Sequence, residues 1–398
     1  MKTSAKFRLS RVAGMLAGIC LVSVAAAAQG APHYLVTNDD LPQANPPVNT
    51  TSVSFYSIGT YGLINLQKTV PTGGYGIGGG YFGLNRLAVL DSGDNQCVYA
   101  SEAATGDIVG VAVSSLAVTS STFGSANDTG ASNGIGLAMN SQYLYASFTD
   151  SSNIGTFQIQ PNCSLSFIND VPVMGLQGGI VDAMAAHGNI LVVTYGDGSI
   201  ESFNISGGTP VSNGDEQNST AAINARGATY PSAIDITQDG HFAIFGDTST
   251  AIVVEVSDIS GGKLAKTVAY DNAFSISSSN LLLSPDETML YISDTQGDRV
   301  SAAFFDKNTG RLSAGCTSDL LKGYSSYWSY LGGLALASSS GNGGGVYVAE
   351  FGNPGSIAMI EVRSSGGKCY MKEVARSPRM DPNSAGLLSI GTFPPRPF

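Results

Sequence analysis

The sequence predicts one all-β domain, a seven-bladed β-propeller with four-stranded blades, and three observations lead to this fold. Only 12% of the 398 residues are charged and 50 are glycine, which favours short strands and tight turns over helices. No long stretch of the chain has helical periodicity. A unit of apolar strand, polar turn, second apolar strand and acidic residue recurs at intervals of about 50 residues, which is typical of propeller blades.

The N-terminal segment differs from the rest of the chain. Residues 1–11 hold four basic side chains and no acidic one, the next stretch is apolar, and a run of small residues ends at Ala28. This order is typical of a secretory signal peptide, and its apolar part is short for a membrane span. We therefore expect a signal peptide over residues 1–28, a single propeller domain over residues 29–398 without a membrane span, and a secreted or periplasmic protein.

The repeated unit is clearest in residues 281–294, where the polar turn 284–287 separates two apolar runs. An alternating strand such as 52–58 follows each unit, and a turn with Gly or Asn leads to a fourth strand. The centres of the second strands mark the repeat: Leu35, Tyr99, Tyr145, Val192, Ala243, Tyr291 and Tyr347.

The first repeat lacks its inner strand, because the chain after residue 28 opens on the second strand, HYLVTND. The C-terminus holds one spare strand within residues 384–393. We expect this strand to complete the first blade and to close the ring, which leaves few exposed sheet edges.

Four cysteines follow the signal segment, and an even number in an exported chain predicts two disulfides. Three connectivities are possible. We favour the pairs that are shortest in sequence, Cys97–Cys163 and Cys316–Cys369. No CxxC spacing occurs, so the sequence does not predict a zinc or redox site.

The charge balance restricts the partners. The chain has 30 acidic and 19 basic residues, and four of the basic residues lie in the signal segment. Nucleic acids and anionic membrane surfaces need basic patches, so neither is an expected partner. We expect a monomer whose ligand is a small molecule, a carbohydrate or another protein.

Two segments resemble the lactonase-type seven-bladed propellers, also called YVTN-repeat proteins. HYLVTND is similar to the name-giving segment, and residues 281–312 resemble the family's commonest repeat. Characterised members include a lactonase that acts on 6-phosphogluconolactone and a muconate-lactonizing enzyme. The resemblance implies a His-Pro-His-like segment before a central inner strand and arginines that face the channel. This chain has Tyr230-Pro231-Ser232 there, with Arg226 nearby.

One acidic residue ends or follows the second strand of every blade. On a propeller these side chains are expected at one mouth of the channel, on the face that also carries the connections into the inner strands, here called the loop face. Seven carboxylates on one rim attract cations, so a divalent cation such as Ca²⁺ is one hypothesis. The alternative is that they accept hydrogen bonds from turn N–H groups. The residues are Asp39, Glu102, Asp150, Asp197, Asp247, Asp294 and Glu350.

Two connections on the loop face are rich in aromatic residues. Residues 73–86 hold Tyr81 among glycines, and residues 322–333 hold Tyr327, the single tryptophan Trp328, and Tyr330. Aromatic side chains on such loops can stack on a sugar or cap a ligand pocket. Packing between blades is the alternative.

The sequence favours binding over catalysis. His187 and His241 fall in turns between first and second strands, on the face opposite the loop face, so a histidine-based triad is not expected. Arg226 with Asp235 is the one acid–base candidate near the altered His-Pro-His segment. We therefore expect an exported lactonase-like propeller that binds a ligand, cation or partner on its loop face and requires no cofactor. The alternative is a lactone hydrolase with a histidine-free site.

Overall fold

The computed structural model describes residues 33–42, 50–59, 62–78, 85–123, 135–148, 152–218, 233–246, 251–257, 262–271, 278–294, 298–322, 331–337, 344–352, 354–375, 377, 379–384 and 389–395. Within these residues the strands form seven antiparallel sheets. The predicted all-β propeller of four-stranded antiparallel blades is confirmed. The signal peptide expected over residues 1–28 lies outside the described residues.

The blades are numbered here from the N-terminus. Blade 1 contains β1 (Tyr34–Asn38), β2 (Ser52–Ile58), β3 (Ile64–Pro71) and β30 (Ser389–Phe393). Blade 2 contains β4 (Leu87–Asp91), β5 (Gln96–Glu102), β6 (Asp107–Ala112) and β7 (Ala117–Phe123). Blade 3 contains β8 (Ile135–Met139), β9 (Tyr143–Phe148), β10 (Asn153–Ile159) and β11 (Leu165–Pro172), with the short 3₁₀ helix η2 (Pro161–Cys163).

Blade 4 contains β12 (Val181–His187), β13 (Ile190–Tyr195), β14 (Ser199–Asn204), β15 (Val211–Ser212) and β16 (Gln217–Asn218). Blade 5 contains β17 (Ala233–Ile236), β18 (Phe242–Gly246), β19 (Ala251–Ser257) and β20 (Lys263–Asp271). Blade 6 contains β21 (Ser278–Leu283), β22 (Met289–Asp294), β23 (Val300–Asp306) and β24 (Arg311–Thr317). Blade 7 contains β25 (Leu331–Ala337), β26 (Gly344–Glu350), β27 (Gly355–Ser365), β28 (Lys368–Glu373) and β29 (Arg379–Asp381).

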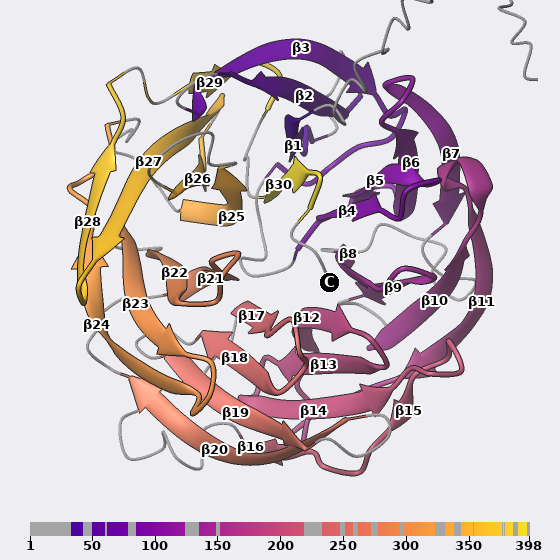
Figure 1. Ribbon diagram of the computed structural model, residues 1–398. Coiled ribbons are helices and arrows are strands. Elements are labelled where there is room, and N and C mark those ends of the chain that lie inside the picture. Colours follow the sequence, from indigo (N-terminus) through magenta and orange to yellow (C-terminus); the bar gives the residue numbers. More distant parts are fainter. Residues whose placement is uncertain are drawn as a thin grey trace, which may run out of the picture. The chain divides into compact units, whose positions relative to one another are not determined.

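The blades are arranged around a central channel (Figure 1). Strands β4, β8, β12, β17, β21, β25 and β30 lie innermost, and each contacts the innermost strand of the next blade. The last strand, β30, pairs with the first, β1, with Tyr34 opposite Phe393 and Asn38 opposite Ser389. The two ends of the propeller chain therefore share one sheet.

The second and third strands are largely buried in the blades where their side chains are described. Strands β1, β2, β6 and β10 are buried along most of their length, whereas the outer strand β24 is largely exposed. Alternation in the sequence of the third strands is typical of half-buried strands. The third strands are buried on both faces because each blade is covered by a neighbour on either side.

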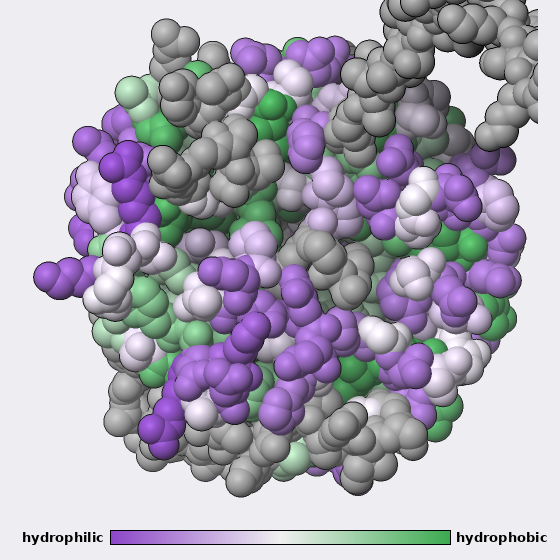
Figure 2. Space-filling model, in the orientation of Figure 1, coloured by the Kyte–Doolittle hydropathy of each residue, from purple (hydrophilic) through white to green (hydrophobic). Residues whose placement is uncertain are grey.

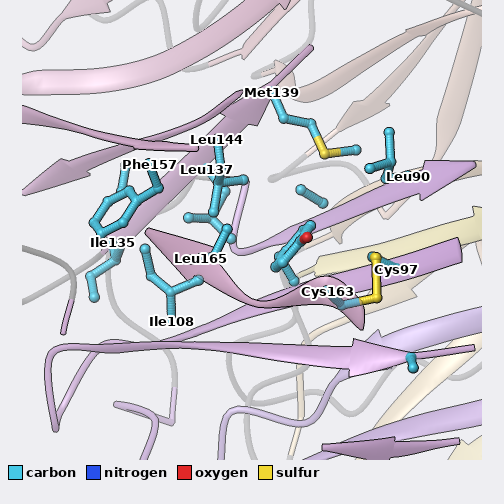
Figure 3. Packing of buried hydrophobic residues seen from close by; sticks show 14 of the residues in the cluster. Leu90, Cys97, Ile108, Ile135, Leu137, Met139, Leu144, Phe157, Cys163 and Leu165 are labelled. Atoms are coloured by element: carbon cyan, nitrogen blue, oxygen red, sulfur yellow. A yellow bond between two sulfur atoms is a disulfide. The ribbon is translucent and has the colours of Figure 1, made fainter. Parts of the chain in front are cut away.

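Apolar layers between blades form the core. Figure 3 shows the layer between blades 2 and 3, where Leu90 and Met139 lie on facing inner strands and Phe157 packs farther out. The disulfide Cys97–Cys163 joins β5 to η2 across this layer, and Cys316–Cys369 joins β24 of blade 6 to β28 of blade 7. Both predicted pairings are confirmed, and both link neighbouring blades.

Blade 4 departs from the expected pattern in its fourth strand. The strand is split into β15 and β16, and Asp215 lies between them. The Asp215 carboxylate accepts hydrogen bonds from Ser202 N and Oγ and from Leu264 N of blade 5. The carboxylate thus replaces part of the backbone ladder along β14.

The surface differs from the interior in polarity. On the face of the ring in Figure 2 much of the coloured surface is hydrophilic, with smaller hydrophobic areas among it. Among the described residues, no helix has the length and hydropathy that a membrane span requires.

Candidate functional site

The central channel holds a cavity of about 230 Å³ that is lined by the innermost strands of all seven blades. Most of the lining is Ala, Leu, Ile, Val and Met. The described lining contains neither Lys nor Arg. Its polar members, spread over several blades, are Asn85, His187, Gln238, Asp235, Asn280 and Thr392.

Asp235 lies on β17 and lines the cavity, but its carboxylate is engaged by backbone groups. Oδ2 accepts a hydrogen bond from Leu283 N of blade 6 at 2.8 Å, and Oδ1 accepts one from Ile236 N at 2.8 Å. The first bond caps an N–H on the innermost strand of the next blade. Its predicted partner Arg226 lies outside the described residues, as does the segment Tyr230-Pro231-Ser232.

Asp182 is a carboxylate that the sequence analysis did not single out. The register of β12 and β13 shifts between Val181 and Ala183, so Asp182 is the extra residue of a β-bulge. Such bulges redirect a side chain and are frequent beside functional sites. The side chain is half-buried, and burial raises the pKa of Asp182 to about 7. A carboxyl group with this pKa can give or take a proton at neutral pH.

Only weak signals in the sequence point to Asp182. It is the one charged residue in VDAMAAH, an otherwise apolar strand whose later residues line the channel. Periodicity alone cannot show a bulge, because the bulge depends on how β13 pairs with β12.

Two of the seven predicted rim carboxylates hold the connections into their own blades. Asp197 accepts hydrogen bonds from Gln177 N at 2.7 Å and from Gly179 N at 3.0 Å. It also accepts two from Ser199, and these bonds outweigh partial burial, so the pKa of Asp197 is lowered. Glu102 is buried and accepts a bond from Gly74 N at 3.3 Å. Burial, with the charge of Asp107, raises the pKa of Glu102 to about 7.

Asp39 and Glu350 are also buried. Asp39 Oδ2 accepts hydrogen bonds from Ser52 Oγ at 2.5 Å and Ser54 Oγ at 2.8 Å, and Glu350 accepts one from Ser356 Oγ. These partners lie on the third strand of the same blade. Asp197 and Glu102 thus accept hydrogen bonds from backbone N–H groups, as in the alternative role, whereas Asp39 and Glu350 accept them from strand hydroxyls.

The described residues bring no three His, Cys, Asp or Glu side chains together in a way that could hold a metal ion. Asp150 and Asp247 lie outside the described residues, and Asp294 ends β22. The Ca²⁺ hypothesis stays a prediction. The aromatic residues Tyr81, Tyr327, Trp328 and Tyr330 also lie outside the described residues.

A buried ion pair lies beside the innermost strand of blade 2. Arg86 Nη1 is 2.6 Å from Asp40 Oδ2, and both residues are almost fully buried. Asp40 Oδ1 accepts a hydrogen bond from Ile77 N. Arg86 is thus held by blade 1, and its charge is neutralised within the protein.

His187 differs from its predicted place on a surface turn. It is the last residue of β12, is half-buried, and lines the channel beside Gln238. His241 stacks on Phe242 with the ring centroids 4.2 Å apart. The channel therefore does contain a histidine, at the end opposite the loop face.

Comparison with known proteins gives the family. The model described as "Lactonase, 7-bladed beta-propeller" matches residues 97–373, more than half of the chain. Among curated protein sequences, none matches this chain significantly.

Solved structures share the fold at low sequence identity. A proposed 6-phosphogluconolactonase of Bacteroides fragilis has a TM-score of 0.61 and 15% identity, over 92% of this chain and 99% of that one. A functionally unknown protein of Desulfotomaculum acetoxidans has a TM-score of 0.61 and 14% identity, over 89% and 99% of the two chains. The periplasmic gluconolactonase of Pseudomonas aeruginosa has a TM-score of 0.51 and 13% identity, over 73% and 82%. With the family match, the repeat and the channel, the chain belongs to the lactonase family of seven-bladed β-propellers.

Proposed function

We propose that this protein is an exported binding propeller that takes a small, uncharged and largely apolar molecule in its central channel. The observation that supports it is the channel lining, which is mostly aliphatic and has no Lys or Arg among the described residues. Apolar pockets with a few polar groups are typical of small-molecule sites. Asp235, Asn280 and Gln238 supply such polar groups.

A phosphorylated sugar lactone fits this lining poorly. Phosphate binding uses Arg or Lys, or several free backbone N–H groups. Arg86, the cation that precedes the innermost strand of blade 2, is already paired with Asp40. Asp182, which directly precedes the lining residues of β12, adds negative charge to blade 4 in its ionised form.

The binding proposal can be tested with neutral lactones, aliphatic alcohols and 6-phosphogluconolactone as probes in isothermal titration calorimetry. We expect heat with neutral, largely apolar probes and none with the phosphorylated one. Asn280→Phe narrows the channel and should abolish binding, whereas Ser114→Phe on an exposed turn should leave it unchanged. Binding that is equal in wild type and Asn280→Phe would exclude the channel as the site.

The tryptophan offers a second readout. The chain has one tryptophan, Trp328, so its fluorescence reports on the aromatic loop alone. We propose that this loop caps the ligand, and a probe should then change the emission. Trp328→Ala should weaken binding without lowering the melting temperature.

Lactone hydrolysis is the second candidate, and Asp182 favours it. A carboxyl group with a pKa of about 7 in a protected position suits a general base that activates water. Turnover of neutral lactones in a pH-stat should rise through pH 7 and fall by about 100-fold or more in Asp182→Asn. Asp94→Asn on an exposed turn is the matched control. Turnover that Asp182→Asn leaves unchanged would exclude this role.

A further inference from the structure

Two buried carboxyl groups meet where the last blade contacts the first. Asp39 follows β1 of blade 1, and Asp381 ends β29, which pairs with β27 of blade 7. Both residues are completely buried. They are called the seam pair here.

One hydroxyl group lies between the two carboxyl groups. Thr37 Oγ1 is 2.5 Å from Asp39 Oδ1 and 3.1 Å from Asp381 Oδ2. A threonine hydroxyl has a single hydrogen, so it can donate to only one of these oxygens. The other contact is a hydrogen bond only if that carboxyl group carries a proton and donates it to Thr37.

The remaining contacts surround both carboxyl groups with donors. Asp39 Oδ2 accepts hydrogen bonds from Ser52 and Ser54 of β2. Asp381 Oδ1 accepts a bond from Asn383 N at 3.1 Å, and Tyr56 faces Asp381. The two contacts of Thr37 are therefore both hydrogen bonds when one of the two carboxyl groups carries a proton.

No cation neutralises the seam pair among the described residues that contact it. Arg86 pairs with Asp40, the buried residue that follows Asp39, and its charge is neutralised there. The other titratable groups near the pair are Tyr56 on β2, which faces Asp381, and Glu350 on β26, whose partner Ser356 lies opposite Met380 in the ladder. Two carboxylates in such a place cannot both ionise without repulsion and a large desolvation cost.

We propose that Asp39 and Asp381 share one proton, and that this proton couples the contact between blade 7 and blade 1 to pH. Loss of the proton places two negative charges in one dry cluster. The blades are then expected to separate at this seam before the rest of the propeller unfolds.

The direction of the titration agrees with the geometry. Burial, and then the charge of Asp381, raise the pKa of Asp39 well above its ordinary value of 3.8, and burial raises the pKa of Asp381. Because the folded protein holds the proton more tightly than the unfolded chain, this contribution to stability is complete below pH 3.8. It is lost as the pH rises through the raised folded value.

Asp381→Asn tests the proposal, because its amide can donate where the shared proton does and cannot ionise. We would measure melting temperature from pH 4 to pH 9 in wild type, Asp381→Asn and the exposed control Asp94→Asn. The difference between Asp381→Asn and wild type should grow in favour of the variant as pH rises. The infrared band of a protonated carboxylic acid at neutral pH should be weaker in the variant.

Two outcomes overturn the proposal. The first is melting curves for wild type and Asp381→Asn that run parallel at every pH, with equal infrared bands. The second is a wild-type melting temperature that Ca²⁺ raises and a chelator lowers while Asp381→Asn responds to neither, which would make the pair a cation site. If Asp381→Asn does not fold, Thr37→Val keeps the shape and removes a hydroxyl that lowers the pKa of both carboxyl groups, so the infrared band should persist to higher pH than in wild type. A band that disappears at lower pH in Thr37→Val would overturn the proposal.

Discussion

At the residue scale, one sequence position has different protonation behaviour in different blades. Asp197 is partly exposed and surrounded by N–H and hydroxyl donors, so it stays ionised. Glu102 and Asp39 are enclosed, and burial favours their neutral forms. The seven positions are equivalent in the repeat, but the side chains there do not all carry a charge. They therefore do not form a rim of seven equal charges.

Replacement of Asp197 by Asn should destabilise the protein at neutral pH. The amide keeps one acceptor oxygen but turns an N–H₂ group toward backbone donors, and we expect a loss of about 1–2 kcal/mol in the free energy of unfolding. Because the folded pKa is lowered, the contribution is present above the unfolded value and is lost as pH falls through the folded one. Urea unfolding at a series of pH values should show a loss that is full at pH 7 and shrinks as the pH falls below 3.8, and Asp94→Asn should change none of these values.

The sequence could predict part of the candidate site. The acidic positions and Asp235 stand out because they interrupt an apolar repeat. The pairing of Asp39 with Asp381 could not be foreseen, because Asp381 belongs to no repeat position and reaches blade 1 only through the ring. A role for Asp182 could not be predicted, because the direction of its side chain depends on a bulge in the pairing of β12 with β13.

At the scale of elements, the connections into the innermost strands are held by the turns of their own blade. Gly74 shows how closely they approach: a Cβ atom there would lie 1.9 Å from Glu102 Oε2 and 2.5 Å from Thr105 Oγ1. Glu102 is buried and has little room to move. The glycine is thus required for contact between the loop and the carboxyl group.

Gly74→Ala should destabilise the protein by about 1–3 kcal/mol, the range for a side chain forced into a packed site. Gly207→Ala is the matched control, because a Cβ atom there would meet no atom within 4 Å. Chemical denaturation of both variants measures the difference. Equal stability of Gly74→Ala and Gly207→Ala would show that the loop can shift away from Glu102 at no cost in stability.

The disulfides act between elements of neighbouring blades. Removal of Cys316–Cys369 by a double Cys→Ala change should cost about 2–4 kcal/mol, by analogy with loops of similar length. The bond joins the outer strands of blades 6 and 7. The rate of amide hydrogen exchange should therefore increase most in those two strands when the bond is removed. Exchange that increases equally in all blades would contradict a local role.

The hairpin unit made most strands predictable, since alternation and turn residues are local features of the chain. The split fourth strand of blade 4 and the extra strand β29 could not be predicted from these local features. The split strand depends on the Asp215 side chain, which replaces part of the backbone ladder. Strand β29 depends on pairing with β27, from which β28 separates it in the sequence.

At the scale of the whole molecule, stability should depend on the last strand. β30 pairs with β1 in blade 1, and it also contacts the innermost strands of blade 7 (β25) and blade 2 (β4). Truncation after residue 384 should abolish cooperative unfolding of the entire propeller, as measured by near-ultraviolet circular dichroism. A synthetic peptide of residues 385–395 added to the truncated chain should restore the signal, and local fraying alone would contradict this view.

The pairing of β1 with β30 also sets the order in which the chain can finish folding. A ribosome releases β1 first and β30 last, so the first blade must wait, incomplete, until nearly every other residue has been made. Its open edge is exposed for that whole time, and contacts so distant in sequence form slowly. A synthesis that stops before β30 would thus leave six blades with all their strands and a first blade that cannot be completed.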